Sequence, residues 1–161
     1  MTRKELKINY EEYDDLEQLI EDDRTLLALA MATTKNAYAP YSMFYVGAAI
    51  LMDNGEIVCG SNQENAAYPS GLCAERVAMF AASSQYPNVA MKTIAITVHS
   101  DKINIDSPVS PCGSCRQVIA EYEYKQKKNI KIIIRGTEGK IWIINGINSL
   151  LPFVFNADNL I

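Results

Sequence analysis

Three cysteines with the spacing of a metal site are the most informative residues of the sequence. Cys73 opens the stretch CAER, and Cys112 and Cys115 lie in the stretch PCGSC. A Cys-x-x-Cys pair at the start of a helix can turn both thiols toward one metal ion, and a third cysteine supplies the next ligand. Helix N-termini favour thiolates over thiols. The set therefore predicts a zinc site.

Glu75, two residues after the first of these cysteines, points to a catalytic zinc. Three protein ligands leave one coordination position open, whereas a structural zinc normally has four protein ligands. A carboxylate in the first turn of a helix can reach a metal-bound water and move its protons, which typically adds about 10²- to 10⁴-fold in rate. Three thiolates leave the site with a net negative charge, for which Arg76 and Arg116 could compensate.

The segments around these residues have the pattern of alternating strands and helices. Helices are expected over about 13–36, firmest from Arg24, over 73–85 and 113–128, with a short one near 147–151. Strands are expected over 43–52 and 56–62, joined by a DNG hairpin turn, and over 93–100, 130–136 and 139–145. Successive strand, helix and strand favour parallel pairing. We predict a three-layer α/β/α fold with a mixed five-stranded sheet, in which the later helices bring the cysteines together.

Length and composition favour a single globular domain, because the chain has 161 residues and 48% hydrophobic content. Residues 1–24 hold nine acids against four bases. We therefore divide the chain into an acidic N-terminal extension, residues 1–23, and one catalytic domain, residues 24–161. No apolar run approaches the roughly 18 residues of a membrane helix, and no basic stripe follows the chain. We expect a cytoplasmic protein with neither a membrane nor a nucleic-acid partner.

Beyond the cysteines, several motifs resemble those of the zinc-dependent cytidine deaminases, in the cytidine and deoxycytidylate deaminase superfamily. They are APYSMFYVGAA, NQENAAY, CAER, SPCGSCRQV and LLPFVF, spread over about residues 24–155. Cysteine as the first ligand matches the small homotetrameric class. The resemblance implies hydrolytic deamination of free cytidine and deoxycytidine, with release of ammonia, in pyrimidine salvage. Such an enzyme is a hydrolase of a cyclic amidine C–N bond with one zinc per subunit.

The resemblance also implies catalytic roles. Cys73, Cys112 and Cys115 would hold the zinc, whose activated water attacks C4 of cytosine. Glu75 would take the proton of that water and pass protons to N3 and to the leaving amine. Arg76 is assigned to charge balance among the thiolates.

Substrate contacts follow from the same resemblance. Asn62 and Glu64 would bind the ribose hydroxyls, and Phe44 would pack beside the base. Ala74 would leave room and its backbone for the base. Three further residues are expected to line a neighbouring subunit's site: Ala66, Tyr68 and Phe155.

Other interpretations of the same residues stay open. Phe44 alternates with Val46 and Ala48, which is typical of a core strand face, and Asn62 and Glu64 could belong to an ordinary polar loop. Cys59 could be a small buried thiol. If it were instead a fourth ligand, the zinc site would be structural. PCGSC could also be a redox dithiol. Finally, the substrate could be another cytosine compound, such as blasticidin S, or a base within RNA or DNA.

Overall fold

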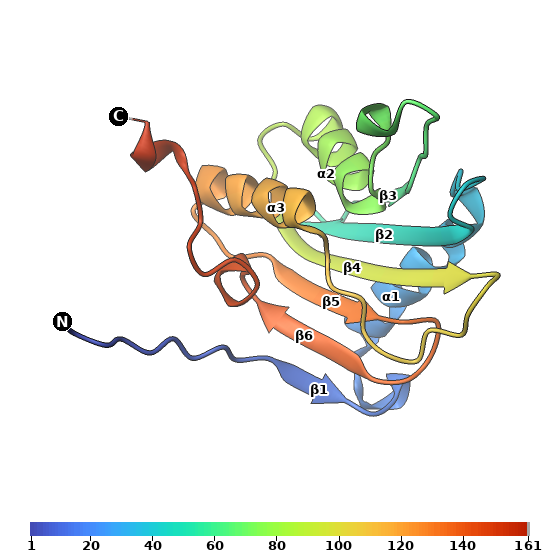
Figure 1. Ribbon diagram of the computed structural model, residues 1–161, viewed down its shortest axis with the longest axis horizontal. Helices are drawn as coiled ribbons and strands as arrows, with labels where there is room; N and C mark the ends of the chain where they lie inside the picture. The colour runs from blue at the N-terminus through green and yellow to red at the C-terminus, as the bar shows by residue number, and fades with distance from the viewer. Residues whose placement is uncertain (161) are drawn as a thin grey trace.

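The computed structural model describes residues 1–160 and contains one six-stranded mixed sheet (Figure 1). The strand order is β1-β6-β5-β4-β2-β3. The strands are β1 (Glu11–Tyr13), β2 (Phe44–Met52), β3 (Ile57–Ser61), β4 (Met91–Ser100), β5 (Lys131–Arg135) and β6 (Ile141–Asn145). Strands β4 and β5 run parallel, and the other neighbouring pairs are antiparallel.

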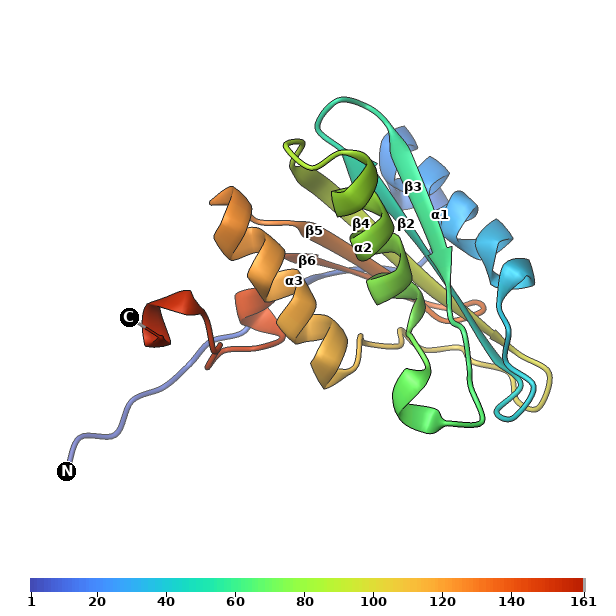
Figure 2. The same cartoon turned by 90° about the horizontal axis from the view of Figure 1, so that it is seen from above.

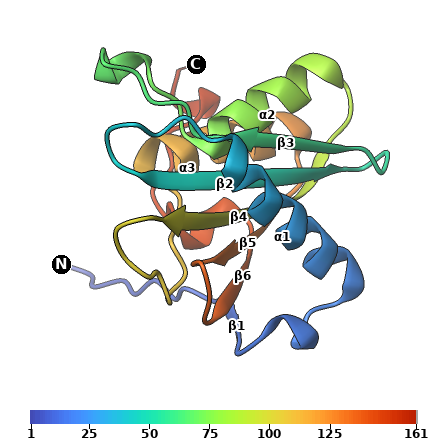
Figure 3. The ribbon, with the colours of Figure 1, turned by 90° about the vertical axis from the view of Figure 1, so that its right-hand side faces the viewer.

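Three α-helices cover the two faces of this sheet. They are α1 (Glu21–Thr33), α2 (Ala74–Gln85) and α3 (Gly113–Gln126). Helix α1 lies on one face, and α2 and α3 lie side by side on the other (Figures 2 and 3). Short 3₁₀ turns complete the structure at Leu16–Gln18, Thr34–Asn36, Tyr68–Ser70, Ile147–Ser149 and Ala157–Asn159.

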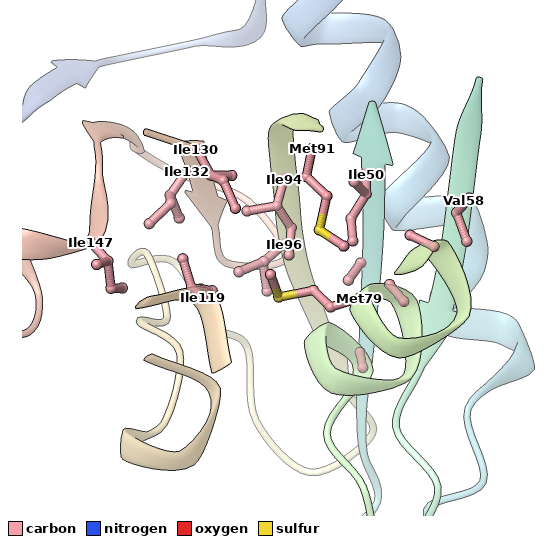
Figure 4. Close-up of a cluster of buried hydrophobic side chains, with 14 of the residues drawn as sticks. Ile50, Val58, Met79, Met91, Ile94, Ile96, Ile119, Ile130, Ile132 and Ile147 are labelled. Atoms are coloured by element: carbon pink, nitrogen blue, oxygen red, sulfur yellow. The ribbon is translucent and has the colours of Figure 1, made fainter. Parts of the chain in front are cut away.

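Strand alternation divides the core into two clusters. Ile94 and Ile96 of β4 point toward α2 and α3, whereas Ala95 between them points toward α1. Figure 4 shows the larger cluster, in which Met79 of α2 and Ile119 of α3 meet isoleucines of the sheet. Each isoleucine fully buried in this way contributes about 1.5–3 kcal/mol. This packing fixes α2 and α3, and with them the cysteine segments, against the sheet.

Two glycines let helices approach the sheet closely. A Cβ atom on Gly47 of β2 would lie 2.0 Å from the carbonyl oxygen of Ala30 in α1. One on Gly60 of β3 would lie 2.5 Å from the backbone nitrogen of Ala78 in α2. The start of α2, where Cys73 and Glu75 lie, is therefore set by contact with the backbone of β3.

The structure corrects two expectations. The sheet has six strands, not five, because Glu11–Tyr13 adds β1 beside β6. Its three residues carry no apolar alternation, so the pattern gave no sign of a strand. Cys59 is exposed, not buried, because in the edge strand β3 it lies on the face opposite Val58 and Gly60, which α2 covers. The helices expected over 73–85 and 113–128 correspond to α2 and α3, whereas the expected helix over 13–36 contains α1 flanked by two 3₁₀ turns.

Part of the N-terminal segment packs on the domain. Leu19 is buried, and Tyr13 and Leu16 pack against the smaller core cluster beside α1. Within residues 1–160 there is no helix with the length and apolar character needed to cross a membrane.

Candidate metal centre and active site

The first turns of α2 and α3 bring the three predicted cysteines together. Cys73 immediately precedes α2, Cys112 immediately precedes α3, and Cys115 lies in the first turn of α3. The Sγ atoms of Cys73 and Cys112 are 3.7 Å apart, and those of Cys112 and Cys115 are 3.5 Å apart. All three Sγ atoms lie within 4.8 Å of one another.

This cluster fits a tetrahedral metal ion. Zinc–sulfur bonds of about 2.3 Å at tetrahedral angles place two ligand sulfurs about 3.8 Å apart, close to the separations observed. Three cysteine thiolates are also a donor set that zinc prefers. The cluster is the one group of this kind within residues 1–160, and Cys59 is not part of it.

The surroundings of the cluster favour a thiolate at Cys73. The pKa of Cys73 falls to about 5, because it accepts a hydrogen bond from the Cys115 thiol and lies beside Arg76 and Cys112. The pKa of Cys115 is raised, because Cys115 shares its proton with Cys73 and is buried. Arg76 donates from Nη2 to the Cys73 sulfur at 3.6 Å. Its buried Nε has no hydrogen-bond partner among the described residues, which leaves another donor close to the thiolates.

Glu75 is the buried carboxylate of the site. It lies in the first turn of α2 with 4% of its surface exposed. Burial raises the pKa of Glu75, and the neighbouring Cys73 charge raises it further. A carboxyl group with a raised pKa can both accept and release a proton near neutral pH, as a general acid and base must.

An open, mainly apolar cavity of about 1010 Å³ leads to these groups. Cys73, Glu75 and Cys112 line one part of it, and Phe44 and Glu64 line another. Metal ligands, a buried acid and an aromatic wall thus share one cavity large enough for a small molecule.

The polar side of the cavity is tied to β2 and to the loop before it. The Glu64 carboxylate accepts hydrogen bonds from the backbone N–H groups of Tyr41, at 2.9 Å, and Ser42, at 3.3 Å. Although partial burial opposes the effect, hydrogen bonds from Ser42 and Tyr41 lower the pKa of Glu64. Asn62 accepts from the N–H of Val46 at 2.7 Å and donates to the carbonyl oxygen of Phe44 at 2.9 Å. Asn62 therefore holds the strand segment that carries the aromatic wall.

Similarity to known proteins identifies the family of this chain. The family model described as "Cytidine and deoxycytidylate deaminase zinc-binding region" matches residues 20–131. The chain belongs to this family. A cytidine deaminase of Halalkalibacterium halodurans is 39% identical over 139 residues, covering 86% of this chain and 98% of the relative. One from Sporosarcina psychrophila is 37% identical, covering 86% and 95%.

Solved structures of the family have the same fold. The cytidine deaminase of Burkholderia pseudomallei matches with a TM-score of 0.71 at 32% identity, covering 85% of this chain and all of that one. The enzyme of Mycobacterium tuberculosis matches with a TM-score of 0.64 at 31% identity, covering 83% and 97%. Together with the Cys₃ cluster, the zinc-binding family domain makes zinc the cofactor.

Four other residues that the family resemblance singled out lie in different surroundings. Ala74 is fully buried in the larger core cluster, so its methyl group points away from the cavity. Tyr68 is exposed and lines the cavity. Ala66 and Phe155 are exposed and lie outside the set of described residues that line it.

Arg116 does not serve the cluster as Arg76 does. Its Nε donates to the carbonyl oxygen of Pro111 and its Nη1 to that of Leu150, each at 2.8 Å. These bonds tie the loop before Cys112 to the segment after β6. Arg116 is thus a structural link between two loops of this deaminase fold.

Sequence reasoning missed one wall of the cavity. Lys102, Ile103, Val109 and Ser110 line it from the loop between β4 and α3. This loop carries no spacing that is typical of a site. Only its position just before PCGSC could have suggested that it borders the metal centre.

Proposed function

We propose that this chain is a zinc-dependent hydrolase that deaminates free cytidine and deoxycytidine to uridine and deoxyuridine with release of ammonia. One observation carries the proposal: three cysteines converge beside a cavity that two of them, Cys73 and Cys112, line together with the buried Glu75. Relatives and solved structures that cover most of the chain are cytidine deaminases, which supports cytidine as the substrate.

In this proposal the metal is held by Cys73, Cys112 and Cys115. When bound, zinc supplies a Lewis acid that lowers the pKa of a water molecule to roughly 7. Arg76, in contact with the Cys73 sulfur, offsets part of the negative charge of the thiolates. Each subunit would hold one zinc.

Glu75 is the proposed proton carrier. It accepts one proton from the attacking water and delivers it to N3 of the cytosine ring, and it then moves the second proton of that water from the new C4 hydroxyl group to the departing amine. Its burial favours the neutral form after the first transfer, because the low-dielectric surroundings disfavour a charged carboxylate. Removal of this group should therefore block the chemistry while the metal ligands stay in place.

Substrate binding is assigned to the opposite side of the cavity. Glu64 would accept hydrogen bonds from ribose hydroxyls. The amide of Asn62 donates one N–H to Phe44, and its second N–H is available to the sugar. Phe44 would pack on the base, and the backbone of Ala74 would meet its polar edge.

We further propose a homotetramer in which neighbouring subunits complete each site. Tyr68 is 77% exposed and Phe155 is 57% exposed in the single chain, and together with Ala66 they would lie against a neighbour's substrate. The cavity is open to solvent, so a neighbouring subunit could complete it. The proposed cellular role is pyrimidine salvage in the cytoplasm.

A substrate panel tests the proposal. Zinc-loaded protein is incubated separately with cytidine, deoxycytidine, blasticidin S and a cytosine-containing oligonucleotide, and product and ammonia are quantified. Conversion of the two nucleosides is expected. If blasticidin S or the oligonucleotide were converted and the two nucleosides were not, the enzyme would act on a different cytosine-containing substrate.

Two serine variants separate a catalytic zinc from a structural one. Cys59→Ser should retain both zinc and activity, since Cys59 is exposed and outside the cluster. Cys112→Ser should lose zinc. Loss of zinc from Cys59→Ser would instead support a structural site with four cysteine ligands.

A further inference from the structure

The N-terminal segment lies along the outer edge of the sheet, beside β6 (Figure 1). Strand β1 pairs antiparallel with β6, with Glu12 opposite Trp142. The Glu12 carboxylate accepts a hydrogen bond from Trp142 Nε1 at 2.8 Å and pairs with Lys140. The Tyr10 ring lies 4.8 Å from the Trp142 ring, centroid to centroid. Backbone pairing, an ion pair and aromatic contact therefore act on the same few residues.

The same segment is also held at its two ends. Before β1, the carbonyl oxygen of Asn9 accepts a hydrogen bond from Ser149 Oγ at 3.3 Å. After β1, Leu16 packs against the core cluster beside α1, and Leu19 is 5% exposed. The segment is thus a built part of the sheet edge.

Strand β6 needs such a neighbour. Its other side pairs with β5, so without β1 it would be the edge of the sheet. Its sequence, Ile-Trp-Ile-Ile-Asn, contains no charge and no proline. Uncharged edge strands rich in β-branched and aromatic residues are templates for pairing with another chain. An uncovered β6 would therefore attract a partner strand.

Strand β1 lies outside the part of the chain that matches the family model. The family match begins at residue 20, after β1. The cysteine cluster lies at the start of α2 and α3 and does not include the segment. A function in assembly, not in catalysis, suits this position.

We propose that the outer edge of β6 is a self-pairing surface that β1 of the same chain covers. When β1 is absent, β6 pairs antiparallel with β6 of a second copy and joins two sheets into one. Such a contact is two-fold symmetric, because each edge presents the same strand to the other. The acidic segment thereby limits which assemblies the chain forms.

Truncation tests this. A chain that starts at Asp14 is compared with the full chain by sedimentation velocity over a hundredfold range of concentration. The full chain should keep one assembly mass, whereas the truncated chain should reach at least twice that mass as concentration rises. A synthetic peptide of residues 6–16 should reverse the association, and the same peptide with E12A should do so less well. Cytidine turnover per subunit should stay within twofold, so a failure here is distinct from a failure of the proposed function.

A full-length variant tests the same proposal in case the truncated chain does not fold. Glu12→Ala should shift the emission of Trp142, the one tryptophan of the sequence, to longer wavelength and should favour association at high concentration. Glu5→Ala, at an exposed glutamate outside β1, is the matched control. A folded truncated chain with the mass of the full chain would overturn the proposal, as would association that the peptide leaves unchanged. If truncation unfolds the chain, normal emission and mass in Glu12→Ala would overturn it.

Discussion

Glu123 of α3 shows how one buried carboxylate can tie several elements together. It accepts hydrogen bonds from the N–H groups of Ile130, at 2.8 Å, and Ile147, at 3.1 Å. Burial raises its pKa, and the two backbone hydrogen bonds only partly oppose this. Because the folded-state pKa lies above that of the unfolded chain, the contribution of this group to stability is complete below the unfolded pKa. It is lost as pH rises through the folded pKa.

The prediction concerns the unfolding free energy of the wild type minus that of Glu123→Gln. This difference should fall as pH rises above 4.5, the ordinary pKa of the group, by at most about 1.4 kcal/mol per pH unit. Urea unfolding at a series of pH values measures it. Glu121→Gln, at an exposed glutamate of the same helix, should show no such trend. A difference that rises with pH would contradict the assignment.

Asn62 combines a structural and a proposed binding role in one side chain. Asn62→Ala removes both hydrogen bonds to β2 and the N–H proposed to meet the ribose. We expect KM for cytidine to rise about tenfold or more, which is about 1.4 kcal/mol, with a smaller fall in kcat. Steady-state kinetics beside Asn88→Ala, at an exposed distant asparagine, tests this. An unchanged KM would remove Asn62 from the substrate site.

At the scale of elements, the approach of α2 to β3 sets the position of Cys73 and Glu75. In Gly60→Ala the new methyl carbon would lie 2.5 Å from the nitrogen of Ala78 and 2.7 Å from the oxygen of Ala74. Helix α2 must then move away from the sheet. We expect a loss of about 1–3 kcal/mol in unfolding free energy, together with weaker zinc binding. Gly113→Ala is the control, because nothing lies within 4 Å of its added carbon. Equal stability and zinc affinity in both variants would contradict this.

The same scale shows how far sequence could predict this molecule. The cysteines and Glu75 could be found because their spacing is local to two helix starts, and the larger helices and strands follow hydrophobic periodicity. Strand β1 could not be predicted from the sequence, since its pairing depends on contact between Glu12 and Trp142, which are 130 residues apart. The exposure of Cys59 depends on which face of β3 is covered by α2. The cavity wall at Lys102 and Ile103 depends on the path of a loop without periodic pattern.

At the scale of the whole molecule, bound zinc should both stabilise the fold and protect its cysteine ligands from thiol reagents. Four cysteines are present, and three lie in the cluster. In the zinc-loaded protein a thiol reagent should modify one cysteine, the exposed Cys59, and after chelation it should also modify Cys73 and Cys112, whereas Cys115 is buried. The thermal midpoint should fall on chelation, because a ligand that binds the folded state alone stabilises it. Equal labelling before and after chelation would instead favour a redox dithiol.

The most direct measurement is the rate of uridine formation from cytidine by the zinc-loaded wild type and by Glu75→Gln, with zinc content measured in both. The wild type should convert cytidine. The variant should keep its zinc, because Glu75 is not a ligand, and should lose at least about 10²-fold in kcat. An inert zinc-loaded wild type, or a variant that is equally active, would contradict the account.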